Sequence, residues 1–116
     1  MGATVESRLL RAAAGGDPSA WELLVERILP DLWATALSFG LDDRDATDVC
    51  GVVSVRLAQS LHEVATSGAL AAWLARTGRE ECSRAAAEAA LRRAPVVDLQ
   101  EAAKRRAAAG ERIAIG

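Results

Sequence analysis

The feature that most constrains the fold is a continuous helical pattern that runs from Leu70 to Arg93. At about 100° per residue, its apolar and small residues fall on one side of a helix. These residues are Leu70, Trp73, Leu74, Thr77, Gly78 and Ala85. Arg76, Arg79 and Ser83 point the other way, with Glu80 beside them. A helix of this length with one apolar side must pack against other elements, so the pattern predicts a helical bundle.

Start and stop signals divide the rest of the chain into further helices. Asp17, Asp42 and Asp98 are typical N-cap residues, and each precedes a helical run of apolar positions. We expect Pro30 to break the second run and to open a third one, which Gly40 closes. The expected helices cover residues 4–14, 17–29, 31–39, 42–64, 70–93 and 98–110, with a short turn at 66–68.

The fold class predicted from these signals is all-α, a compact bundle of about five or six helices. The only pattern resembling a strand is the short Ile113–Ile115. A chain of 116 residues can bury one modest core. We expect residues 1–93 to form the helical domain and residues 94–116 to form a linker or an accessory C-terminal helix.

Composition argues against several functional classes. No run of eighteen apolar residues could span a membrane, and no secretory signal precedes the first helix, so the chain is expected to be cytoplasmic. Cys50 and Cys82 lie inside helical patterns without metal-ligand spacing. They are interpreted as core-facing thiols, with a disulfide as the lesser alternative. With one histidine and no nucleophile–base set or phosphate loop, we predict no catalytic residue, no metal, no cofactor and no enzymatic activity.

Charge is distributed unevenly along the chain. Residues 1–75 carry five basic and ten acidic side chains, whereas residues 76–116 carry nine basic and six acidic ones. Such asymmetry indicates two different partner surfaces. The C-terminal part can approach nucleic acid, but it is less basic than a domain that holds DNA on its own.

Four segments in the right order and at the right distances resemble region 2 of a bacterial sigma factor, in particular the extracytoplasmic-function group of the sigma-70 family. They are AWELLVERILPDLWATALSFGL, DATDV, VRL and WLARTGREECSR. The resemblance covers roughly residues 12–93 without a gap. A second DNA-binding domain follows region 2 in full-length relatives, and no counterpart occurs in these 116 residues. We expect either a part of a longer sigma factor or a protein made of the region 2-like domain alone.

The resemblance implies a protein-binding face on the predicted helix 42–64. A broad stripe of apolar residues on this helix is expected to face the core, namely Ala46, Val49, Val53, Leu57 and Leu61. In the family this helix packs against the coiled-coil clamp of the RNA polymerase β′ subunit. By position, the outward residues that would make this contact are Asp48, Gly51, Val52, Val55 and Gln59.

Several of these positions depart from the family pattern. Gly51-Val52 stands where relatives usually carry Gln and an acidic residue, and Ser54 stands where they usually carry a large aromatic one. The exposed valines form an apolar spot. One interpretation is a partner face with altered chemistry, and the other is that these are ordinary surface valines.

The resemblance also implies a DNA-binding face on helix 70–93, where the family holds the minus-ten promoter element and the opened strand. The candidates for phosphate contacts are Arg76, Arg79, Ser83 and Arg84, and residues 62–69 would form the base-reading loop. Glu80 stands where relatives often have arginine. The alternative is a solvated face with the pairs Arg76–Glu80 and Glu80–Arg84. Trp73 is expected in the core. Glu81 is interpreted as a structural ion pair, and Arg84, Arg56 or a backbone amide could satisfy its carboxylate.

These observations predict a sigma-like transcription initiation domain that binds core RNA polymerase and the minus-ten element. Its DNA partner would preferentially be single-stranded promoter DNA. The alternative is a degenerate, sigma-derived interaction module. It would bind an anti-sigma-type regulator or a second copy of itself without melting DNA.

Overall fold

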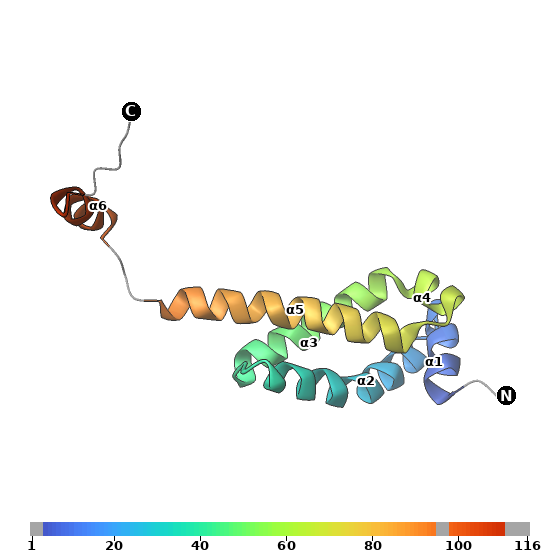
Figure 1. The fold of residues 1–116 in the computed structure, drawn as a ribbon. Helices are drawn as coiled ribbons and strands as arrows, with labels where there is room; N and C mark the ends of the chain where they lie inside the picture. The colour runs from blue at the N-terminus through green and yellow to red at the C-terminus, as the bar shows by residue number, and fades with distance from the viewer. Residues whose placement is uncertain (1–3, 95–97, 111–116) are drawn as a thin grey trace.

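The computed structural model describes residues 4–94 and 98–110, and within them the chain is helical, without strands. The all-α prediction is thereby confirmed, while the pattern at Ile113–Ile115 lies outside the described residues. In Figure 1, α5 lies along α2 and α3, and α1 and α4 lie together at its N-terminal end. The helices are α1 (Val5–Ala14), α2 (Pro18–Ser38), α3 (Asp43–Gln59), α4 (Leu61–Ser67), α5 (Leu70–Arg93) and α6 (Leu99–Ala108).

Side-chain caps begin four of these helices. The Asp17 carboxylate accepts a hydrogen bond from the Ser19 amide at 2.9 Å, and Asp42 accepts one from Asp45 at 2.8 Å. Thr4 and Asp98 cap α1 and α6 in the same way. Each bond satisfies an amide that the first turn of a helix leaves without a partner. The three predicted aspartate caps are therefore confirmed.

The prediction that Pro30 separates two helices is wrong, because α2 continues through it from Pro18 to Ser38. Proline in a helix interior removes one backbone hydrogen bond and costs about 3 kcal/mol. Here Pro30 is exposed, so water can hydrate the carbonyl that lacks a donor. The turns on both sides bury apolar residues on the same face, and this burial holds the helix together across the proline. The buried residues are Ala20, Leu24, Ile28, Leu32 and Ala36.

The predicted helix 42–64 is two helices in the structure. It ends at Gln59, and α4 begins at Leu61 after Ser60, whose backbone (φ −108°, ψ 14°) leaves the helical region. The break redirects α4 so that it packs against α1 as well as α5. Thr66 and Ser67, expected in a turn, belong to α4, which ends at Gly68 in the left-handed conformation.

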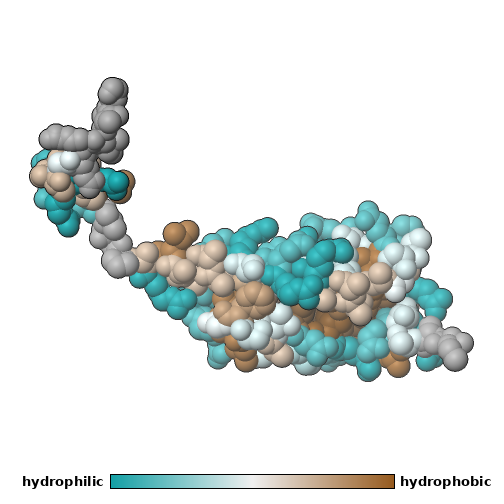
Figure 2. All heavy atoms as spheres, viewed as in Figure 1, coloured by the Kyte–Doolittle hydropathy of each residue, from teal (hydrophilic) through white to brown (hydrophobic). Residues whose placement is uncertain are grey.

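The core lies between α2, α3 and α5. Four residues of the predicted α3 stripe are buried, and Leu61 and Trp73 are partly buried against the core. Trp73 is thus less enclosed than the sequence predicts. A Cβ added to Gly78 would meet Leu32 Cδ2 at 3.4 Å, so this glycine lets α5 approach α2 closely. Figure 2 shows hydrophobic surface between α5 and α2 on this face, within largely hydrophilic surroundings.

The C-terminal helix α6 buries none of its residues and lies apart from the other helices in Figure 1. Leu99 at its start is 78% exposed. Among the described helices, none is long and apolar enough to cross a membrane.

Candidate protein and nucleic-acid interfaces

The outward face of α3 is the first candidate interface. All five predicted partner residues on it are exposed, and they are Asp48, Gly51, Val52, Val55 and Gln59. Val52 and Val55 are 44% and 57% exposed, and they lie next to each other on the helix surface as a small apolar patch. The opposite side of the same helix carries Val53 and Leu57, which are fully buried. The core thus fixes the orientation of α3 and, with it, the outward position of these side chains.

Four of the five residues line one shallow depression with a volume of about 670 Å³. The lining residues are Thr47, Asp48, Gly51, Val52, Val55 and Arg56. Gln59 lies one turn beyond Val55 and does not line it. Sequence reasoning did not assign Thr47 and Arg56 to this surface. The helical spacings 47–51–55 and 52–56 are the signal that could have included them.

Gly51 lines the depression without a side chain. A Cβ built at Gly51 would have no neighbouring atom within 4 Å, so no packing reason requires a glycine there. A Cβ at Gly78, the other glycine inside a described helix, would by contrast meet the Leu32 side chain at 3.4 Å. A glycine within a helix costs about 1 kcal/mol relative to alanine. The cost at Gly51 is therefore not offset by any interaction within the described part of the domain.

A charge network joins the edge of this depression to α5. The Arg56 guanidinium donates a hydrogen bond to the Glu81 carboxylate at 2.7 Å and lies 3.9 Å from Glu80. Arg84 is 3.5 Å from the other carboxylate oxygen of Glu81. The Glu81 side chain is only 7% exposed, so these two arginines compensate a nearly buried charge. The predicted structural ion pair of Glu81 is confirmed.

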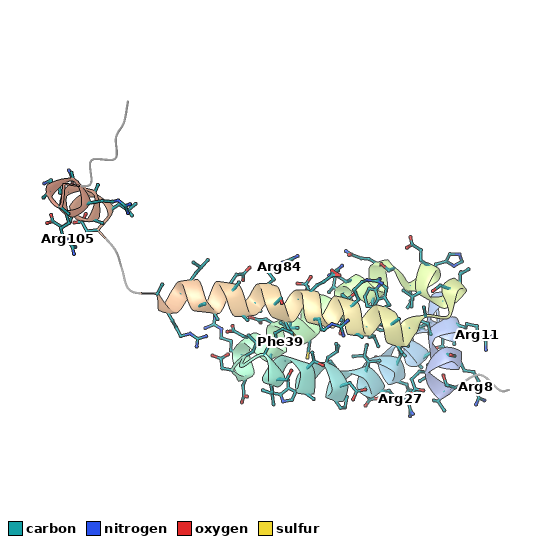
Figure 3. All side chains as sticks on the ribbon, in the orientation of Figure 1. Arg8, Arg11, Arg27, Phe39, Arg84 and Arg105 are labelled. Carbon is teal, nitrogen blue, oxygen red and sulfur yellow. The ribbon has the colours of Figure 1, made fainter. Side chains whose placement is uncertain are left out.

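The outward face of α5 is the second candidate interface. Its predicted DNA-contacting residues Arg76, Arg79, Ser83 and Arg84 are all exposed. Arg76 lies 3.9 Å from Glu80, as the alternative interpretation predicts, whereas Arg84 pairs with Glu81 and not with Glu80. Figure 3 shows Arg84 extending from α5 on the side away from α2, where Arg27 is labelled. Arg79 has no ion pair within the described residues, so it offers the least compensated positive charge of the three arginines.

The segment expected to be a base-reading loop is mostly helical. Residues 61–67 form α4, so only Gly68 and Ala69 connect α4 to α5. A groove of about 540 Å³ lies beside this connection, between α1, α2 and the start of α5. The ion pair of Glu6 with Arg27, at 3.1 Å, forms part of its lining. The position of Glu6 at the N-terminus of α1 and its contact with Arg27 lower the pKa of its carboxyl group.

The two cysteines are buried and free. Burial raises the pKa of both thiols, and the neighbouring Cys50 and Glu81 raise that of Cys82 further. At neutral pH both thiols are consequently protonated and weakly reactive. In the part of the chain that the structure describes, no group of histidine, cysteine or acidic residues is arranged to hold a metal ion.

The sequence that carries these two faces matches one known family. Sigma-70 region 2 matches residues 24–92, which is more than half of the chain. The chain belongs to the sigma-70 region 2 family. No curated protein and no solved structure shows significant similarity to it. The match includes α3 and α5 completely except for the last residue of α5, and it leaves α1 and α6 outside.

Membership in the sigma-70 region 2 family gives the domain a general role in binding RNA polymerase and recognising promoters. The family is non-enzymatic. Within the domain, the matched region carries both candidate interfaces, and Arg56, Glu80 and Glu81 connect them physically.

Proposed function

We propose that the domain contributes to transcription initiation by binding the β′ clamp of core RNA polymerase through α3. The observation that carries this proposal is the depression formed by Asp48, Gly51, Val52 and Val55 within the region that matches the family. Exposed apolar residues beside a recess are typical of sites where a partner inserts a side chain. Gln59 would extend the contact by one helical turn.

We further propose that α5 contacts promoter DNA at the minus-ten element, preferentially as a single strand. Arg79 supplies positive charge without an ion pair within the described residues. Arg76 can turn from the exposed Glu80 carboxylate to a phosphate at small cost, because exposed ion pairs are weak. Arg84 would contact a phosphate while it also compensates the nearly buried Glu81. Ser83 lies on the same side and can donate a hydrogen bond to a phosphate. We place the chain in the extracytoplasmic-function group, with residues 94–116 as a linker or accessory segment.

The clamp contact is tested by measuring the affinity of the domain for purified core RNA polymerase of the source organism. Val55→Asp should weaken binding at least tenfold, because it places a charge in the apolar recess. Its effect on unfolding should stay within about 0.5 kcal/mol, since Val55 is exposed. Val5→Asp is the matched control, because Val5 is a similarly exposed valine on α1. Equal binding by the domain and the Val55→Asp variant would contradict the assignment of α3.

The DNA contact is tested by titrating salt in fluorescence anisotropy measurements with single-stranded and duplex oligonucleotides. Three arginine–phosphate contacts predict a shallow slope of roughly −2 to −3 in a plot of log K against log salt. Glu80→Arg should strengthen binding and steepen the slope. Glu22→Arg makes the same charge change at an exposed position on α2 and should have little effect. Tight, steeply salt-dependent binding of duplex DNA by the unmodified domain would contradict this assignment.

A second candidate is a degenerate sigma-derived module that binds a regulator or a second copy of itself without melting DNA. The pairing of Glu80 with both Arg76 and Arg56 favours it, since this carboxylate lowers the positive potential on one edge of α5. The two candidates make opposite predictions for the same titration. Absence of DNA binding in both the unmodified domain and Glu80→Arg would favour the interaction module.

A further inference from the structure

We infer that the depression at Gly51 receives a single large apolar side chain, of about leucine size, from a helix of core RNA polymerase that carries a basic residue beside it. This inference rests on the proposed clamp contact of α3 and specifies its chemistry. A Cβ built at Gly51 would have no neighbouring atom within 4 Å. The lack of a side chain at this position therefore leaves space at the surface and not in the core.

The shape and lining of the recess select the inserted side chain. Val52 and Val55 supply apolar contacts beside Gly51, and Thr47 lies one turn before it. A protruding side chain that packs between such residues gains contacts with several of them and displaces water from both apolar surfaces. A small partner residue would leave water in the recess. A charged one would lose its hydration and find no opposite charge at the bottom of the recess.

The charges at the edge of the recess indicate which type of residue lies beside the inserted side chain on the partner. Arg56 is already engaged by Glu81 at 2.7 Å and lies 3.9 Å from Glu80. Asp48, by contrast, has no ion pair or side-chain hydrogen bond within the described residues, and it lies in an acidic part of α3 that begins with Asp42 and Asp43. A lysine or arginine next to the inserted side chain complements this edge.

The test fills the recess without disturbing the fold. Gly51→Leu occupies the space, whereas Gly51→Ala gives a similar helix propensity and adds only a methyl group. Both variants should raise the melting temperature, by roughly 4 °C, because a glycine is removed from a helix interior. Ala12→Leu on α1 is the control for an added exposed leucine, since Ala12 is exposed and lies on a helix that does not pack against α3.

The measurement is the affinity of each variant for purified core RNA polymerase. Gly51→Leu should lose at least tenfold in affinity although the domain is more stable, and Gly51→Ala should lose less than about threefold. Ala12→Leu should bind like the unmodified domain. Asp48→Lys should also weaken binding, with a smaller effect at high salt. Gly51→Leu binding within twofold of the unmodified domain would overturn the inference while leaving the clamp contact intact. Absence of polymerase binding by the unmodified domain would overturn both.

Discussion

Removing Arg56 should destabilise the domain far more than removing its partner Glu81. The two side chains form a 2.7 Å ion pair between α3 and α5, in which Glu81 is 7% exposed and Arg56 is 38% exposed. Arg56→Met leaves a nearly buried carboxylate with only Arg84, at 3.5 Å, to compensate it. Glu81→Leu leaves an arginine that still reaches water and lies 3.9 Å from Glu80. Both substitutions break the same ion pair. They differ in cost because the group left without its partner is nearly buried in one case and partly exposed in the other.

The expected magnitudes follow from the same contacts. Breaking a buried ion pair by removing one partner costs about 3–5 kcal/mol, and the remaining contact with Arg84 together with partial solvent exposure reduces this to roughly 2–3 kcal/mol for Arg56→Met. Glu81→Leu should cost about 0–1 kcal/mol. The double variant should resemble Glu81→Leu, because an apolar pair can replace a buried ion pair of similar volume at little cost. The resulting coupling energy is about 2 kcal/mol.

Urea unfolding followed by circular dichroism gives the four free energies of this cycle. The slope of free energy against urea should be the same for all four proteins, which shows that the unfolded reference state has not changed. Arg27→Met removes an arginine from the ion pair with Glu6, in which the two side chains are 47% and 38% exposed, and should cost below about 1 kcal/mol. If Arg56→Met lowers the free energy of unfolding by less than about 0.5 kcal/mol, Arg56 is not needed to compensate the charge of Glu81.

Three further predictions concern other parts of the domain. Trp73→Ala should cost about 2–3 kcal/mol in urea unfolding, at or below the low end of the range for a large aromatic, because Trp73 is only partly buried against the core. Glu6→Gln should destabilise the domain at neutral pH but not in acid. The lowered pKa means that the contribution of Glu6 is present above its unfolded pKa of about 4.3 and is lost as the pH falls through the folded value. Cys50 and Cys82 should react with a thiol reagent only after denaturation, so rapid native-state labelling would contradict their burial.

Helix starts were the most predictable part of the fold. An aspartate cap is a local interaction between a side chain and an amide two or three residues away, so Asp17, Asp42 and Asp98 can be recognised without knowledge of the rest of the chain. The long helix 70–93 was predictable for a related reason. Its 24 residues repeat one apolar side often enough to fix both its type and its orientation.

The two errors in helix boundaries have a common cause in tertiary packing. Proline at position 30 disfavours a helix locally, but burial of Ile28 and Leu32 on the same face outweighs that preference. At Ser60 no glycine or proline marks the break, and the turn is needed for α4 to pack against α1. Both outcomes depend on packing against helices that are distant in sequence, and a local pattern does not contain that information.

The candidate interfaces were predictable only in part. Helical periodicity placed Val52 and Val55 on the outward side of α3, and the structure brings them together with Gly51 in one recess. The pairing of Arg56 was left open among several alternatives, because the partner of Glu81 depends on how α3 crosses α5. A sequence pattern for each helix contains no information on that crossing.

The separation between core and surface on α3 means that the residues that hold the fold and the residues that are available to a partner lie on opposite sides of this helix. Val53 and Leu57 on one side account for the packing of α3 against its neighbours. Gly51 on the other side touches no residue that a side chain would disturb, and its replacement would make the helix more stable. A residue that lowers stability and takes part in no internal contact has no structural reason within the described residues. Its reason must be sought in what binds there, and for that reason the recess at Gly51 is the first place to test the function of this domain.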